Sequence, residues 1–164
     1  MKKLFVIMLA MGLCVFASQS VFAAANDTQT VTYEVTAINE LNLDGATVEL
    51  TVNSAVAGSQ PTQATDSDTY DITTNCAENA KKITGAINTD MPSGLTFKVN
   101  MTAPTGGSSQ GAVTMSETAA NLVTAVDAVA ESNIAIDYSL DATVAAGVVA
   151  SANKTLIVTI ADSL

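Results

Sequence analysis

Apolar and polar residues alternate one by one in several separate stretches of this chain, and this pattern restricts the fold more than any other feature. The alternation is regular in residues 95–101 and 134–140, and it returns in residues 155–160. A period of two places successive side chains on opposite faces, as in a β-strand that buries one face. Turn-forming Gly, Pro and Ser separate the stretches. We therefore predict an all-β protein.

The first stretch of this kind is residues 28–38, TQTVTYEVTAI. As a strand it carries a row of apolar side chains on one face, with Thr and Glu on the other. The apolar row consists of Val31, Tyr33, Val35 and Ala37. We expect a half-buried strand, which pairs either within its own sheet or with the sheet of a neighbouring molecule. The sequence leaves this choice open.

Residues 1–25 have the composition of a secretory signal peptide. Lys2 and Lys3 precede an apolar run, and small residues follow at Ala23 and Ala25. The run is shorter than a membrane-spanning helix requires. Cys14 follows Leu13, which is too large for a lipid-attachment site. We expect cleavage, export to the cell surface, periplasm or extracellular space, and membrane contact during export only.

Between the first strand and residue 74 the pattern predicts a hairpin, a loop and another strand. Asp44 and Gly45 form a turn signal between apolar alternations at residues 41–43 and 46–52. Residues 53–68 have no apolar period and are predicted to form a long loop. Its end brings together Asp66, Asp68 and Asp71. These carboxylates form either a weak calcium site or a solvated acidic turn, because the glycine and distal glutamate of an EF-hand loop are missing.

Residues 117–130 allow two interpretations. Ser116 is a suitable helix cap, and Leu122, Val126 and Val129 fall on one helical face. A strand through residues 122–126 fits equally well. The prediction is either a short helix or a further strand.

Eight or nine strands at intervals of roughly 10–15 residues are typical of a sandwich. With residues 1–25 removed, residues 26–164 suffice for one domain with its own core. No helices of crossover size separate the strands, so a parallel α/β sheet is disfavoured. We predict a single antiparallel β-sandwich of immunoglobulin-like type.

Charge limits the possible partners. Beyond residue 25 the chain has sixteen Asp and Glu against four Lys, with no Arg and no His, and its net charge there is −12. A nucleic acid or an anionic membrane repels such a surface. We expect no nucleic-acid partner, and a surface suited to solubility or to cationic partners.

The sequence contains few residues that are suited to catalysis. The absence of histidine removes the usual general bases and the imidazole metal ligands. The aromatic residues Tyr33, Tyr70, Phe97 and Tyr138 all fall on apolar sides of predicted strands, so we expect them in the core. Cys76 is the only cysteine beyond residue 25, and it is either a buried inert thiol or one half of a bridge between two copies. We predict no enzyme and no cofactor beyond the possible calcium ion.

The strand layout also has a likeness to known families. TVTYEVTAINELNL after the signal, LTFKV in the middle, and NIAIDYSLDATVAAG followed by KTLIVTI resemble bacterial colonisation-factor-type fimbrial major subunits. The chain is more loosely similar to spore-coat-U-like and WxL-like surface proteins, although it lacks Trp. In the fimbrial family the N-terminal strand is donated to the next subunit. The resemblance would place this role on Val31, Tyr33, Val35 and Ala37.

Two functions are therefore expected from the sequence. The first is an exported structural subunit of a filament, fimbria or surface matrix, a homopolymer that assembles by strand donation. The alternative is a monomeric secreted sandwich that binds a ligand through its long loops, with or without calcium.

Overall fold

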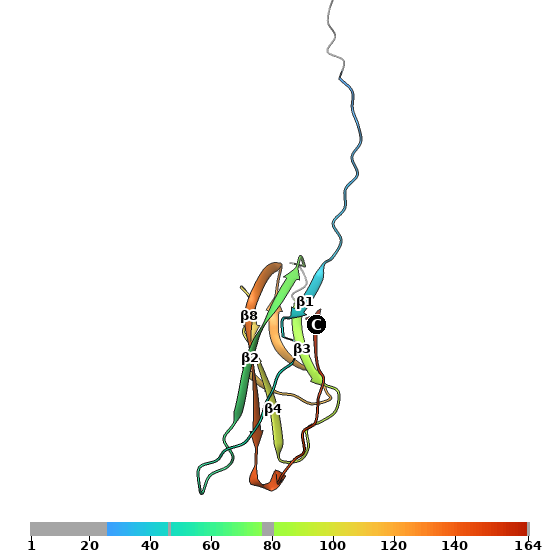
Figure 1. Ribbon diagram of the computed structural model, residues 1–164. Helices are drawn as coiled ribbons and strands as arrows, with labels where there is room; N and C mark the ends of the chain where they lie inside the picture. The colour runs from blue at the N-terminus through green and yellow to red at the C-terminus, as the bar shows by residue number, and fades with distance from the viewer. Residues whose placement is uncertain (1–25, 46, 77–80, 164) are drawn as a thin grey trace, which may run out of the picture. The chain divides into compact units, whose positions relative to one another are not determined.

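The computed structural model describes residues 26–45, 47–76 and 81–163, so the predicted signal peptide lies outside the described residues. The chain divides into two units, residues 1–34 and residues 35–164, and all the strands that the structure describes lie in the second (Figure 1). The described strands are β1 (Asn39–Leu43), β2 (Ala64–Thr74), β3 (Lys81–Ile87), β4 (Leu95–Met101), β5 (Ser108–Ser109), β6 (Ala112–Thr114), β7 (Ala120–Val126), β8 (Val129–Ala142) and β9 (Leu156–Asp162). A single 3-10 turn, η1 (Val144–Ala146), is the described helical element.

These strands form two antiparallel sheets. One sheet has the order β1-β2-β8-β4-β6 and the other the order β5-β7-β3-β9. Alternating apolar residues from both sheets meet between them, which explains why a period of two recurs along the chain. The predicted all-β, antiparallel β-sandwich is confirmed. Its immunoglobulin-like type stays a prediction.

The core between the sheets is built from the alternating residues that the sequence indicated. Ile72, Ile83, Val99, Leu122 and Ile136 are among its fully buried members. The aromatic prediction is correct for Tyr70 and Tyr138, which are buried, and the ring of the partly buried Phe97 stacks on Tyr138 with centroids 6.3 Å apart.

The predicted strand at residues 28–38 is absent. The first strand begins at Asn39, and residues 28–38 carry no strand pairing within the described chain. The side chain of Tyr33, expected in the core, is exposed. The alternation is present in the sequence, but the described sheets offer this segment no ladder partner. Of the two alternatives, pairing within its own sheet is not observed, and pairing with a neighbouring molecule stays a prediction.

The region after β1 also differs from the prediction. β1 pairs with β2 rather than with residues 46–52, which form no described strand. Val48 and Leu50 nevertheless pack against the core, which explains their alternation. The predicted loop 53–68 ends early, because β2 begins at Ala64 and its first half pairs with β8. Pairing with a long neighbouring strand outweighs the low apolar content of residues 64–68.

Residues 120–126 form a strand, so the helical interpretation of residues 117–130 is wrong. The register between β3 and β7 shifts twice, once on each side of Ile83. Each shift inserts an extra residue into β7, and one of them includes Ala125, whose φ is +54°. These bulges turn Leu122, Val123 and Val126 all inward. A bulged strand thereby reproduces the spacing of a helical face.

The sandwich has two distinct ends. β2 finishes and β1 starts at one end, where β9 also finishes, because Asn39 pairs with Thr74 and Lys81 pairs with Asp162. We call this the Asn75 end. The opposite end, where β9 starts, carries the loops of residues 53–62, 88–94 and 143–154, and we call it the loop end (Figure 1). At that end Val144 donates its N–H to the Gln60 side chain at 2.8 Å, so the first and third loops touch.

Candidate functional site

The segment of residues 26–38 presents its apolar row to solvent. The side chains of Val31, Tyr33 and Val35 are 76%, 90% and 79% exposed, and Ala37 is exposed as well. Three consecutive alternate positions with large apolar side chains on the surface are unusual for a folded protein, which normally exposes such residues singly. This row is the strongest candidate for an interaction site in the described chain.

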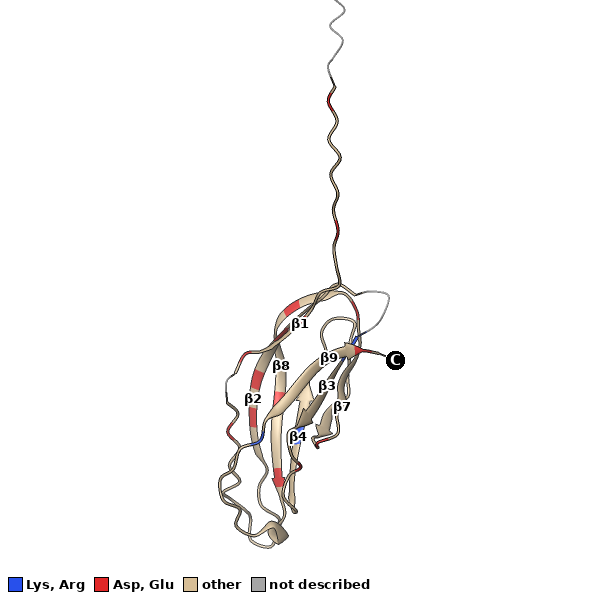
Figure 2. Ribbon diagram, turned by 90° about the vertical axis from the view of Figure 1, so that its right-hand side faces the viewer, with Lys and Arg blue, Asp and Glu red and all other residues tan. Residues whose placement is uncertain are grey.

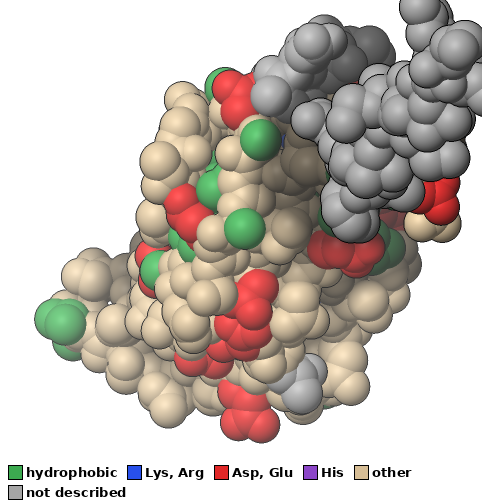
Figure 3. Space-filling view, turned by 90° about the horizontal axis from the view of Figure 1, so that it is seen from above, with side chains coloured by type: hydrophobic (Ala, Val, Ile, Leu, Met, Phe, Trp, Pro, Cys, Tyr) green, Lys and Arg blue, Asp and Glu red, His purple; other side chains and the backbone are tan. Residues whose placement is uncertain are grey.

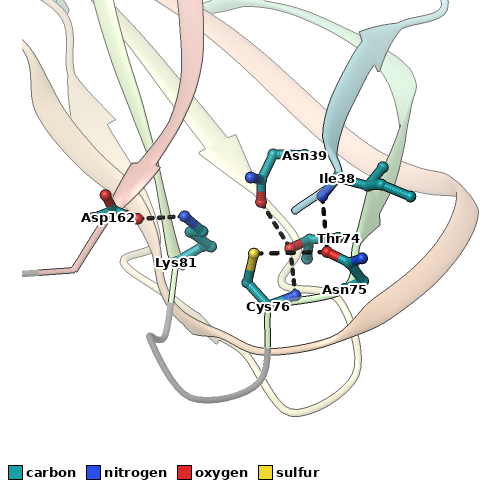
Figure 4. A network of polar contacts seen from close by, with 7 residues as sticks. All are labelled: Ile38, Asn39, Thr74, Asn75, Cys76, Lys81 and Asp162. Carbon is teal, nitrogen blue, oxygen red and sulfur yellow. Dashed lines mark hydrogen bonds and ion pairs between the residues drawn. The ribbon is translucent and has the colours of Figure 1, made fainter. Parts of the chain in front are cut away.

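The junction between this segment and the sandwich is held by one side chain. The Asn75 carboxamide accepts the N–H of Ile38 at 2.8 Å (Figure 4). It also donates to the carbonyl of Thr36 at 2.8 Å. The N–H of Asn75 also donates to the Ile38 carbonyl at 3.3 Å. Asn75 thus takes the place of a strand partner for residues 36–38. It fixes where the segment leaves the sandwich.

Next to this junction lie Cys76 and an ion pair. Thr74 donates its hydroxyl to the Asn39 side chain at 2.8 Å, and the Cys76 N–H donates to Thr74 Oγ1 at 3.3 Å. Cys76 is a free thiol and is partly exposed, so the alternative of a buried thiol is wrong, and a bridge between two copies stays a prediction. Lys81 pairs with Asp162 at the end of β9 (Figure 4). The hydrogen bond to Asp162 raises the pKa of the Lys81 ammonium.

The second part of the candidate site is the free edge of β9. This strand pairs with β3 on one side and has no ladder partner on the other among the described residues. Leu156, Val158 and Ile160 face the core but are only half buried, whereas Ile83 and Ile87 of the neighbouring β3 are buried. The inner face of β9 is therefore covered less completely than that of β3.

The other edge strands present shorter edges. β5 and β6 have two and three residues, and β1 has five, whereas β9 has seven. β1 and β9, which are edge strands of the two different sheets, also lie against each other. Proteins usually blunt an edge by shortening it or by adding charge or proline. Residues 156–161, LIVTIA, carry neither a charge nor a proline.

The three aspartates proposed for calcium do not converge. Because β2 keeps a continuous register over residues 64–70, Asp66 and Asp68 share the side of Tyr70, whereas Asp71 lies on the opposite side. Asp66 accepts the N–H of Glu49 at 3.1 Å. Asp71 accepts the N–H of Asn133 at 2.9 Å. In the described part of the chain, no group of three His, Cys, Asp or Glu side chains is arranged to hold a metal ion.

These carboxylates have structural partners instead. Asn133 has a φ of +57° and lies where β8 bulges against β2, and Asp71 satisfies its displaced N–H. Asp68 lies against Gly45, where a Cβ atom would stand 1.6 Å from a carboxylate oxygen. Only glycine fits there without displacing Asp68.

Acidic residues recur along β2 and β8 (Figure 2). The one described cross-strand ion pair of this sheet joins Lys98 of β4 to Asp141 of β8 at 2.9 Å. Gln63 donates to the other oxygen of Asp141 at 2.7 Å. The hydrogen bond from Lys98 is the largest cause that lowers the pKa of the Asp141 carboxyl. Burial opposes it, and the hydrogen bond from Gln63 lowers this pKa further.

A hollow of about 890 Å³ lies at the loop end. Its apolar lining includes Leu50, Met91, Leu95, Leu140 and Val149. It lies at the end of the molecule opposite to Asn75. The predicted calcium residues do not line it.

Sequence reasoning found the apolar row but missed Asn75 and the β9 edge. Asn75 lies in a stretch that interrupts the alternation of apolar and polar residues, and Asn75 and Cys76 together match no recognisable sequence motif. The β9 sequence was recognised as a strand, but strand order decides which strand is an edge. No local pattern in the sequence carries that information.

Comparison with protein families, with curated proteins and with solved structures gave no match. Within the described residues no helix has the length and apolar content needed to cross a membrane.

Proposed function

We propose that this protein is an exported structural subunit of an extracellular filament, fimbria or surface matrix. In this proposal, residues 28–38 of one copy add to the free edge of β9 in another copy. The observation that carries the proposal is the exposed apolar row of Val31, Tyr33 and Val35, which has the period of a strand and no partner among the described residues.

The free edge of β9 also supports the proposal. β9 is seven residues long, and it offers one edge without a ladder partner among the described residues and a half-buried inner face. The donated segment supplies both hydrogen-bonding groups and apolar side chains. The likeness to fimbrial subunits in strand layout points in the same direction. An immunoglobulin-like arrangement of strands belongs to this proposal.

The energy available is sufficient. Burying three or four apolar side chains contributes about 1.5–3 kcal/mol each, or roughly 5–12 kcal/mol in total. This is comparable with the stability of a whole domain, about 5–15 kcal/mol. A contact in which one copy donates and the next receives does not close on itself, so it builds a fibre.

The test compares two faces of the donated segment. A variant with Val31→Asp and Tyr33→Asp is expected to abolish filaments in electron microscopy and sedimentation, because the added charges fall in the buried row. The matched control, Thr30→Asp with Thr32→Asp, adds the same charge to the other face and is expected to retain filaments. Deletion of residues 26–38 is expected to leave soluble monomers.

Tyr33 also reports the association directly. It is the exposed tyrosine of a chain without tryptophan, so iodide is expected to quench its fluorescence in monomers and not in filaments. Filaments formed equally well by both double variants and by the deletion would refute strand donation.

The hollow at the loop end favours a second candidate function, a secreted monomer that binds a ligand between its loops. This candidate predicts a monomer at all concentrations, including after long incubation. Its ligand would protect residues of loops 53–62 and 143–154 from hydrogen exchange rather than residues 28–38.

A further inference from the structure

We propose that the loop end is itself a contact surface, and that its occupant is the Asn75 end of the next copy in the filament. The inference rests on the proposed function. It adds the direction in which the donated strand pairs with β9, and the surface that contacts the next copy in the filament. It follows from where the segment is tethered and which way β9 runs.

β9 runs from the loop end, where Leu156 pairs with Ile87, to the Asn75 end, where Asp162 pairs with Lys81. A donated strand that is antiparallel to β9 therefore enters with its N-terminal residues at the Asn75 end of the acceptor. Its last residue, Ile38, then lies at the loop end of the acceptor. Because Asn75 clamps residues 36–38 to the donor's own sandwich, the Asn75 end of the donor must follow directly.

The parallel direction gives a different assembly. Ile38 of the donor would then lie at the Asn75 end of the acceptor, from which the acceptor's own segment also departs. Two copies placed in this way can exchange segments reciprocally, and the pair closes as a dimer. Asn75 holds residues 36–38 at the end of the sandwich where β9 finishes. A segment that folds back along the β9 strand of its own copy therefore runs parallel to it. A continuing filament therefore requires the antiparallel direction, whose hydrogen-bonded ladder is also the slightly more stable one.

The loop end has the chemistry of such a contact. Val56, Val144, Val148 and Val149 are exposed there, and we call them the loop-end valines. Two of the three loops lie within residues 50–62 and 142–155, which contain no carboxylate and whose one charged residue is Lys154, whereas the loop of residues 88–94 contributes Asp90. In a molecule whose net charge beyond residue 25 is −12, these loops are where another acidic copy approaches with the least repulsion.

The opposite end carries charges of both signs, because Lys81 pairs with Asp162 there and Lys82 follows in β3. The view from above shows Asp and Glu side chains across the visible part of that face, with apolar side chains scattered singly (Figure 3). Loops 53–62 and 143–154, which contain no carboxylate, therefore add no like-charge repulsion to the carboxylates of this face.

The test uses the exported protein with Val144→Asp and Val148→Asp. Both side chains are exposed, and the fold is expected to persist. The critical concentration for sedimentable filaments is expected to rise at least about tenfold, because two charges must be desolvated at the contact. The matched control, Thr65→Asp with Ala135→Asp, adds the same two charges to exposed positions on β2 and β8 and is expected to leave the critical concentration unchanged.

Cross-linking measures the same contact in another way. In the Val148→Cys variant, every copy carries one thiol at the loop end and Cys76 at the other. A bismaleimide is expected to give a ladder of dimers, trimers and longer products, which collapses to dimers at most when Cys76→Ser is added. Cross-linked dimers through Cys76 alone, or an unchanged critical concentration for Val144→Asp with Val148→Asp, would overturn the inference. In either case the Val31 and Tyr33 variants still report whether strand donation occurs.

Discussion

At the scale of single residues, two non-glycine residues with positive φ, Ala125 and Asn133, lie in the bulges of β7 and β8. Asn133 is a residue type that tolerates this conformation, and Asp71 accepts its N–H. Alanine does not tolerate this conformation well, because the left-handed region costs it about 1–2 kcal/mol, and Ala125 is therefore strained. The bulge in β7 is maintained because it places Val123 and Val126 in the core.

This strain predicts a stabilising substitution. Ala125→Gly is expected to raise the free energy of unfolding by about 0.5–1 kcal/mol, because relief of the strain exceeds the extra entropy of glycine in the unfolded chain. Ala120→Gly, in the same strand without a positive φ, is expected to lower it by about 0.5–1 kcal/mol. Urea unfolding measures both. Equal losses for the two variants would show that Ala125 is unstrained.

The Asn75 clamp predicts a second effect at this scale. Asn75→Ala removes two hydrogen bonds to residues 36–38 and is expected to cost about 1–2 kcal/mol of stability. It also loosens the direction in which the segment leaves, so filaments are expected to become more curved in electron microscopy. Asn75→Asp keeps the acceptor for the Ile38 N–H and loses the donor to Thr36, so its effect is expected to be intermediate.

At the scale of strands, polar pairs secure the register on the outer face of the larger sheet. Lys98 of β4 and Asp141 of β8 lie diagonally across the ladder in which Lys98 pairs with Ser139. Gln63, just before β2, completes the group. The three side chains thus tie together three neighbouring strands near the loop end.

The lowered pKa of Asp141 makes this contribution dependent on pH. A carboxyl whose folded pKa lies below its unfolded value of about 4 stabilises the fold above that pH and loses the effect as pH falls through the folded pKa. Asp141→Asn is expected to lower the free energy of unfolding at pH 7 by at most about 1 kcal/mol, since the pair is partly exposed. Urea unfolding at pH 7, 5 and 3 is expected to show this difference shrinking. A difference that stays constant across this range would contradict the ion pair.

At the scale of the whole molecule, charge opposes association while burial favours it. Each copy carries a net charge of −12 beyond residue 25, and the fold places many of these carboxylates along β2 and β8 (Figure 2). In a filament, these negatively charged copies lie next to one another. Their growth therefore depends on how strongly the solvent screens the charges.

Assembly is accordingly expected to accelerate with salt. The screening length falls from about 30 Å at 0.01 M to about 10 Å at 0.1 M. We expect a shorter lag and a lower critical concentration in 0.1 M NaCl, measured by light scattering. Equal ionic strength from MgCl₂ and from NaCl serves as the control for specific cation binding. Slower assembly at higher salt would show that attraction between charges drives the contact.

Alkaline stability tests the core of the sandwich. Burial, and then the nearby Asp68 and Asp66, raise the pKa of Tyr138 to about 12, and burial also raises that of Tyr70. A raised folded pKa means that the stabilisation is complete below pH about 10 and is lost as pH rises toward 12. Near-ultraviolet circular dichroism is expected to show cooperative unfolding in this range. Tyr138→Phe is expected to shift its midpoint upward.

The period-two alternation determined most of the fold. An alternating row yields a strand wherever a sheet lies beside it, so the strands at residues 82–87, 95–101, 134–140 and 155–160 were predictable from their own residues. Composition likewise determined the acidic surface and the absence of imidazole chemistry. These properties are local or additive, and they do not depend on which strands become neighbours.

Tertiary structure decided the remainder. Pairing with β8 extended β2 through the polar residues 64–68, and two bulges made β7 resemble a helical face. Strand order alone left β9 at an edge and residues 28–38 without a ladder partner in the described chain. A strand's own sequence specifies which of its faces is apolar. Whether that face and the adjacent backbone are covered depends on neighbours that are distant along the chain.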